Sequence, residues 1–129
     1  MKTMIDNTDF DILAHLTCPI RYIKGKYGYN IDIDRYSDKI TDILKSIIEK
    51  DIALEVNTSA FNTLNDFMPS KTIIKEYYDM GGRLITLGSD AHIAENASNH
   101  FDKAITIIKE IGFENICYFQ NRKINKIKI

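Results

Sequence analysis

The sequence has few of the residues that mark several classes of protein. Tryptophan is absent, and the 129 residues include only two cysteines and two prolines. Cys18 and Cys117 lie far apart in the sequence and form no CxxC pair. Neither cysteine has the neighbours of an activated nucleophile, so we expect two unpaired thiols in a reducing compartment.

Long apolar runs and an excess of one charge are also missing. No run approaches the ~20 residues that span a bilayer, and residues 1–7 lack the apolar core of a secretory signal. Lys and Arg together number 17 against 18 Asp and Glu, which gives no general reason to expect nucleic acid or membrane as a partner. We therefore expect a cytoplasmic protein. The 44% of apolar residues suits one domain with a buried core.

Short apolar runs alternate along the chain with segments of helical periodicity. Strands are predicted at residues 10–16, 52–57, 84–87 and 115–119, and helices at residues 34–50, 69–80 and 96–111. Residues 18–30 and 58–68 are predicted as loops, and residues 123–129 as a short edge strand. This β-α-β-α-β-α-β order predicts an α/β fold with a parallel sheet and right-handed crossovers.

Polar residues follow the predicted strands, where parallel α/β folds gather their functional groups. Asp90 and His92 are two residues apart on an extended segment, so their side chains point to the same side and can reach one cation. Mixed Asp and His ligation suits zinc, manganese or iron. The alternative is that Asp90 caps a helix and His92 is merely exposed. His15 ends the first predicted strand, where a loop histidine without a ligand role is the alternative.

Other polar residues have more than one interpretation. Glu55 is either a functional carboxylate or a buried group paired with a lysine, and the second is favoured. His100 is expected to be a surface residue. Arg21, Arg122 and Lys123 are ordinary solvated charges unless a substrate phosphate is present, in which case the arginine fork suits it.

Several motifs together resemble those of PHP-type histidinol-phosphatases. Residues 11–16 (DILAHL), 54–59 (LEVNTS), 81–92 (GGRLITLGSDAH) and 119–123 (FQNRK) each resemble a motif of that family. The combination of the GSDAH and NTS elements is the most specific part. The resemblance runs from about Phe10 to Arg122, which is nearly the whole chain.

The resemblance implies a fold and a reaction. The fold would be the C-terminal half of a distorted (β/α)7 TIM-like barrel with parallel strands. Up to three divalent metal ions at the carboxyl ends of the strands would activate water to attack the phosphorus of L-histidinol phosphate. The products would be L-histidinol and phosphate, within histidine biosynthesis.

The resemblance also assigns residues of this chain. His15, Asp90 and His92 fall on metal-ligand positions, and Asp90 and His92 would also be catalytic. The residues expected to bind substrate or phosphate are Arg21, Asn57, Ser89 and Arg122.

The sequence departs from the family pattern in three places. Residues 1–9 contain no histidine, although the family begins with an HxH pair. Thr17 replaces an Asp that often follows the His of this motif, and Ala60–Asn62 stands where many members have Gly-Leu-Arg. We therefore expect residues 1–129 to form a single partial PHP domain that lacks the N-terminal strands.

Four or five strands cannot close such a barrel, which usually needs about 200 residues or more. Completion by an N-terminal chain or by a second copy is therefore expected. One alternative is a non-catalytic remnant or oligomerising module. Another is a PHP phosphoesterase that acts on a different small phosphate ester.

Overall fold

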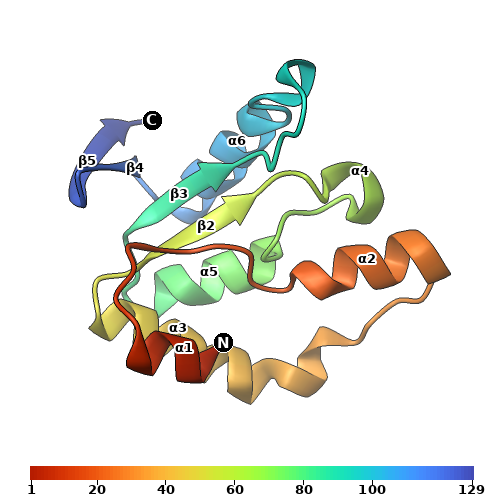
Figure 1. Cartoon of the computed structure of the whole chain (residues 1–129), viewed down its shortest axis with the longest axis horizontal. Coiled ribbons are helices and arrows are strands. Elements are labelled where there is room, and N and C mark those ends of the chain that lie inside the picture. Colours follow the sequence, from red (N-terminus) through yellow and green to blue (C-terminus); the bar gives the residue numbers. More distant parts are fainter.

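A parallel sheet of three strands lies at the centre of the structure, a computed structural model that describes residues 1–129 (Figure 1). The strands are β1 (Ile12–Leu13), β2 (Ala53–Asn57) and β3 (Ile85–Gly88), in the order β1-β2-β3. Leu13 lies opposite Leu54, and Asn57 lies opposite Gly88. The residues that follow β2 and β3 therefore leave the sheet at the same edge. The α/β class and the parallel pairing of the first three strands are confirmed.

Six α-helices precede or connect the strands. They are α1 (Lys2–Asn7), α2 (Cys18–Tyr27), α3 (Ser37–Glu49), α4 (Phe61–Leu64), α5 (Lys71–Asp79) and α6 (Phe101–Ile111), with short 3₁₀ turns at Ile33–Tyr36 and Ala94–Asn96. The Ser70 hydroxyl accepts a hydrogen bond from the Ile73 amide and so caps α5, directly after Pro69. No helix combines the length and the apolar character that a bilayer crossing requires.

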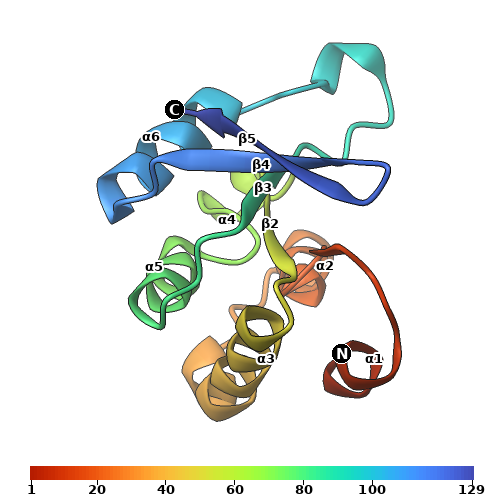
Figure 2. The same ribbon diagram turned by 90° about the vertical axis from the view of Figure 1, so that its left-hand side faces the viewer.

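The core lies between the sheet and the helices α3 and α5, which Figure 2 shows on the same side of β2. Leu54 and Val56 of β2 are fully buried in this core, together with Leu44 of α3 and Ile74 of α5. Side chains alternate between the two faces of a strand. The opposite face of the sheet therefore carries small and polar residues, namely Ala53, Glu55, Asn57, Thr86 and Gly88.

The fourth predicted strand does not extend the parallel sheet. β4 (Asn115–Gln120) pairs antiparallel with β5 (Lys123–Lys128) in a separate two-stranded sheet. Asn121 and Arg122 form the two-residue turn, both with positive φ, and this turn geometry favours a local hairpin. The strand predicted at residues 123–129 is confirmed. A barrel half is not visible in this arrangement and remains a prediction.

The prediction of a loop at residues 18–30 was wrong, because α2 occupies Cys18–Tyr27. Pro19 lies in its first turn, and Gly28, in the left-handed conformation, ends it. Both signals were present in the sequence.

Other boundaries also differ from the predictions. The first strand has only two residues, α4 interrupts the loop predicted at residues 58–68, and α1 was not predicted. The last predicted helix begins at Phe101 rather than Asn96, because Ala94–Asn96 forms its own 3₁₀ turn.

Replacing Gly82 by Ala is expected to destabilise the fold by about 1–3 kcal/mol. A Cβ at Gly82 would clash with ring atoms of Tyr77. That ring cannot easily give way, because Tyr77 is 1% exposed and donates a hydrogen bond of 3.0 Å to the Leu84 carbonyl. Urea unfolding would measure the change in the free energy of unfolding.

The matched control is Gly25→Ala in α2. A Cβ there would meet only Thr63 Cγ2, at an ordinary 3.5 Å. Because Ala is a better helix former than Gly, this variant should gain up to about 1 kcal/mol. Equal effects of the two substitutions would contradict the steric explanation.

Candidate active site

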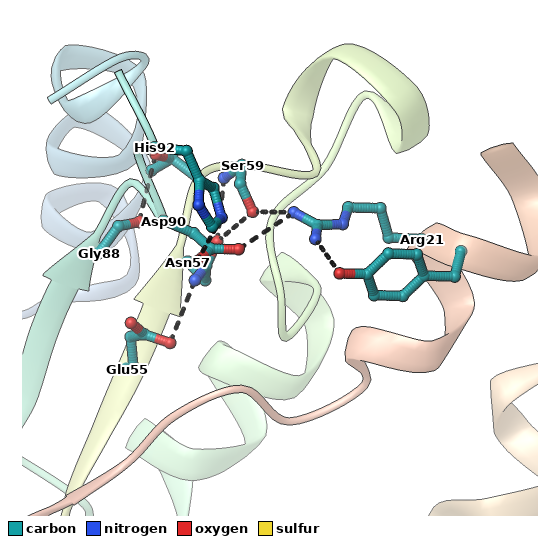
Figure 3. A network of polar contacts seen from close by, with 9 residues as sticks. Arg21, Glu55, Asn57, Ser59, Gly88, Asp90 and His92 are labelled. Atoms are coloured by element: carbon teal, nitrogen blue, oxygen red, sulfur yellow. Dashed lines mark hydrogen bonds and ion pairs between the residues drawn. The ribbon is translucent and has the colours of Figure 1, made fainter. Parts of the chain in front are cut away.

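A network of polar side chains lies at the edge where β2 and β3 end (Figure 3). Asp90 follows β3 in the left-handed conformation, with φ of 50°. Arg21 reaches the same edge from α2. Its Nη1 lies 3.5 Å from Asp90 Oδ2 and donates a hydrogen bond to the Ser59 hydroxyl. Side chains from three separate segments therefore meet at one place.

Asn57 holds this network together from within the sheet. It is fully buried, and its Oδ1 accepts hydrogen bonds from the Ser59 amide at 3.0 Å and from the Ser59 hydroxyl at 2.6 Å. Its Nδ2 donates to Glu55 Oε2 at 3.3 Å. Asn57 therefore orients two neighbours and has little capacity left for a direct contact with a substrate.

Glu55 is a site residue that the sequence analysis left open. Burial raises the pKa of its carboxyl, and the Asn57 hydrogen bond and the charge of His15 partly offset this, while the negative Asp90 adds to the increase. No lysine pairs with Glu55, so the favoured interpretation of a lysine partner was wrong. The carboxylate instead lies within electrostatic reach of two predicted ligands. Its place two residues before Asn57, on the same face of β2, was the signal in the sequence.

The stability of the fold should depend on pH through Glu55. Its pKa in the unfolded chain is the ordinary 4.5, and in the folded protein it is raised. Its contribution to stability is therefore fully present below pH 4.5 and is lost as the pH rises through the folded pKa. We expect Glu55→Gln to match the wild type near pH 4 and to raise Tm at pH 7 by about 2 °C. Thermal melts by circular dichroism at both pH values would measure this.

Glu110→Gln on the exposed face of α6 is the matched control and should show no such pH-dependent difference. A Glu55→Gln variant that is less stable than the wild type at pH 7 would contradict the assignment.

The predicted metal ligands are only partly brought together. His92 Nε2 lies 3.9 Å from Asp90 Oδ1, and the His92 side chain is 89% exposed. His15 follows β1 with φ of 79° and influences Glu55 electrostatically. No group of three or more His, Cys, Asp or Glu side chains is arranged to hold a metal ion. The donor types suit a divalent cation.

Arg122 lies away from the network. Its guanidinium donates to both Asp9 oxygens at 2.8 Å and to Asp11 Oδ1 at 3.1 Å. These contacts hold the pKa of Asp9 below its usual range. Asp11 precedes β1, at the opposite end of that strand from His15, and Figure 1 shows the β4–β5 hairpin at the end of the sheet from which β3 starts. The predicted phosphate contact of Arg122 has no counterpart in this arrangement and remains a prediction.

Two cavities flank the Arg21–Asp90 pair. The first is a shallow, open depression of about 440 Å³ that carries two positive charges, and its lining consists of Arg21, Tyr22, Gly25, Lys26, Ser59 and Thr63. The second has a volume of about 140 Å³ and is entirely polar, and its lining consists of Thr58, Ser59, Asn62, Ser89, Asp90, Asn96, Asn99 and His100. Ser59 lines both. We call them the cationic cavity and the polar cavity.

His100, which was expected at the surface, is partly exposed and contacts two neighbouring side chains. Its ring packs against Phe61 with centroids 4.7 Å apart, and its Nε2 lies 2.9 Å from Asn62 Oδ1. It is half-buried at the start of α6 and forms one wall of the polar cavity.

A parallel sheet with charged and polar side chains at its carboxyl edge is typical of α/β enzymes. No protein-family model matches the chain. The chain is 30% identical over 126 residues to a probable histidinol-phosphatase of Thermotoga maritima, covering 98% of this chain and 51% of that protein. It is 31% identical over 121 residues to a histidinol-phosphatase of Lactococcus lactis, covering 93% and 44%.

A solved structure of a histidinol phosphate phosphatase also matches the chain. The crystal structure of histidinol phosphate phosphatase from Lactococcus lactis, complexed with zinc, L-histidinol and phosphate, matches with a TM-score of 0.78 and 27% identity. The match covers 96% of this chain and 47% of that one. The chain is therefore histidinol-phosphatase-like, as its motifs predicted, and it spans about half the length of the curated relatives it matches.

Proposed function

We propose that this chain supplies the C-terminal part of the site of a metal-dependent phosphomonoesterase that hydrolyses L-histidinol phosphate. The observation that carries the proposal is the meeting of Arg21, Ser59 and Asp90 at the carboxyl edge of the sheet. The similarity to histidinol-phosphatases over nearly the whole chain supports it. We also propose that the reaction is a step of histidine biosynthesis in the cytoplasm.

Each residue of the network has a role in this proposal. The Arg21 guanidinium binds the phosphate oxygens, because its planar fork matches their geometry. Asn57 fixes Ser59, which in turn orients Arg21. Asp90 and His92, with His15, are the donors for a divalent cation, and Ser89 contacts the substrate. Such a cation, when bound, would supply a water of lowered pKa and would neutralise charge on the phosphate. In the overall reaction the oxygen of water bonds to phosphorus, the bond to the ester oxygen breaks, a proton from that water passes to the ester oxygen, and L-histidinol and phosphate are released.

A complete site needs donors beyond those of this chain. No set of three donors is in place for a metal ion, and relatives of about twice the length carry further residues. We propose that residues 1–129 form a partial PHP domain, one part of a TIM-like barrel. The missing strands and donors come from a polypeptide that corresponds to the N-terminal half of the relatives, and a second copy of this chain is the alternative. The incomplete donor set also favours a second candidate function, that of a non-catalytic oligomerising module.

Phosphate release from L-histidinol phosphate with added manganese or zinc tests the proposal. The chain is assayed alone and after mixing with the N-terminal half of the Thermotoga maritima relative. We expect turnover only in the mixture. Turnover by the chain alone would overturn the partial-site proposal, and a mixture that binds but does not turn over would support the non-catalytic module.

A matched pair of variants controls for the site itself. Arg21→Ala should lower turnover in the mixture strongly, because it removes the phosphate contact. Arg83→Ala should not, because Arg83 lies over the Tyr78 ring and bonds to the Tyr78 and Gly82 carbonyls, away from the network. Hydrolysis of a different small phosphate ester in preference to L-histidinol phosphate would instead indicate another phosphoesterase activity.

A further inference from the structure

Exposed tyrosines gather on α2 and on the segment that follows it. Every exposed aromatic side chain of the protein except Tyr118 lies there, namely Tyr22, Tyr27, Tyr29 and Tyr36. α2 buries none of its residues, and residues 25–30 are all exposed. A contiguous group of exposed apolar side chains marks a surface that interacts with another molecule, and tyrosine is enriched in protein–protein interfaces.

Two of these tyrosines are already arranged as a pair. The rings of Tyr27 and Tyr29 stack with centroids 6.5 Å apart and an interplanar angle of 16°. Gly28 between them is left-handed, with φ of 71°, and turns the chain where α2 ends. Lys26 Nζ lies 5.2 Å from the centre of the Tyr27 ring. A surface whose side chains are ordered in advance loses less conformational entropy when it binds.

The charge of this segment changes sign at Asp32. Residues 18–31 contain no acidic residue but three basic ones, namely Arg21, Lys24 and Lys26. Asp32 and Asp34 come next and are both exposed. Ile31 and Ile33 alternate with them and line a cavity that Ile20 of α2 also lines. The isoleucines therefore point into the molecule, and the two carboxylates point outward beside the basic part.

Neighbouring patches of opposite charge fit a second copy of this chain. Four charged side chains of the segment form no ion pair within the chain, namely Lys24, Lys26, Asp32 and Asp34. In a twofold-symmetric contact each copy presents the same surface, so the basic part of one copy meets the acidic part of the other, twice. A nucleic acid or an acidic protein would be repelled by the two carboxylates.

We infer that the chain forms a symmetric dimer through this surface, which we call the tyrosine surface and define as Lys26, Tyr27, Tyr29, Asp32 and Asp34. The stacked rings form its centre, and Lys26 of each copy faces Asp34 of the other. The inference does not depend on the proposed function, because it concerns association of the chain and not hydrolysis.

Sedimentation equilibrium of the full chain at several concentrations tests the inference. The mean mass should rise with concentration from 14.9 kDa towards that of a dimer. Lys26→Glu and Asp34→Lys should each weaken dimerisation by about tenfold or more, because like charges then face each other twice. An equal mixture of the two variants should form a heterodimer, because both contacts regain opposite charges.

Tyr27→Ser should also weaken dimerisation, and Tyr118→Ser is its matched control. Tyr118 is exposed as well, but it lies on the β4–β5 hairpin, which Figure 1 shows on the opposite side of the molecule from the end of α2. All the substituted side chains are exposed, so the circular dichroism of each variant should match that of the wild type.

Three results would overturn the inference. The first is a mass that stays at 14.9 kDa at every concentration. The second is association that is unchanged by both charge reversals, or that is weakened only by Tyr118→Ser. The third is a mixture of the two charge variants that associates no more strongly than either variant alone.

Discussion

Replacing Asp90 by Asn is expected to lower phosphate release in the complemented assay by about a hundredfold or more. The change removes the negative charge beside Arg21 and His92 but keeps the size of the side chain and an oxygen that can accept from Arg21. A loss of activity would therefore report on charge and cation binding rather than on shape. The measurement is the initial rate of phosphate release from L-histidinol phosphate.

Asp102→Asn is the control for this prediction. Asp102 lies in the first turn of α6, is exposed and takes part in no ion pair. Its replacement should leave the initial rate of phosphate release within about twofold of the wild-type rate. If Asp90→Asn also stayed within that range, Asp90 would not belong to the catalytic machinery.

Leu54→Ala should cost about 3 kcal/mol of folding free energy, within the range measured for buried leucines. Leu54 is fully buried in the central strand, with β1 and β3 on either side and the helices above it. The resulting cavity cannot close easily, because the neighbouring strands fix the backbone. For a domain whose total stability is about 5–15 kcal/mol, this is a large fraction, and urea unfolding at pH 7 would measure it.

Ile93→Ala removes similar apolar volume from a residue that is 58% exposed. It should change the free energy of unfolding by no more than about 0.5 kcal/mol. A comparable loss in the two variants would mean that burial is not the cause.

The sequence predicted most of the regular elements, because their patterns are local. The apolar periodicity of α3 and α5, and the compact runs of β2 and β3, needed no tertiary information. α2 was missed because residues 18–30, with a proline, two glycines and three tyrosines, resemble a loop, although Pro19 and Gly28 marked the ends of the helix. The antiparallel pairing of β4 with β5 was also missed. A strand can pair with an adjacent segment or with a distant one, and the local sequence pattern does not determine which.

The sequence predicted contacts in the candidate site only between residues that are close together in the chain. Asp90 and His92 were predicted to be neighbours from their separation of two residues, and His92 Nε2 lies 3.9 Å from Asp90 Oδ1, although Asp90 is left-handed rather than extended as the prediction assumed. The approach of Arg21 to Asp90 joins residues 69 positions apart, and only the family resemblance had assigned Arg21 a role. Arg122 was assigned a role in the same way, but Asp9 and Asp11 hold it elsewhere. No local signal distinguishes these two arginines.

The contact between Arg122 and Asp9 bears on the order in which parts of the protein unfold. It joins residues 113 positions apart, through side chains that are 56% and 84% exposed. Closing so long a loop is entropically unfavourable, and salt screens exposed charges. The C-terminal hairpin should therefore detach before the rest of the fold opens, and its amide protons should exchange with solvent faster as ionic strength rises, while those of β2 keep their rate.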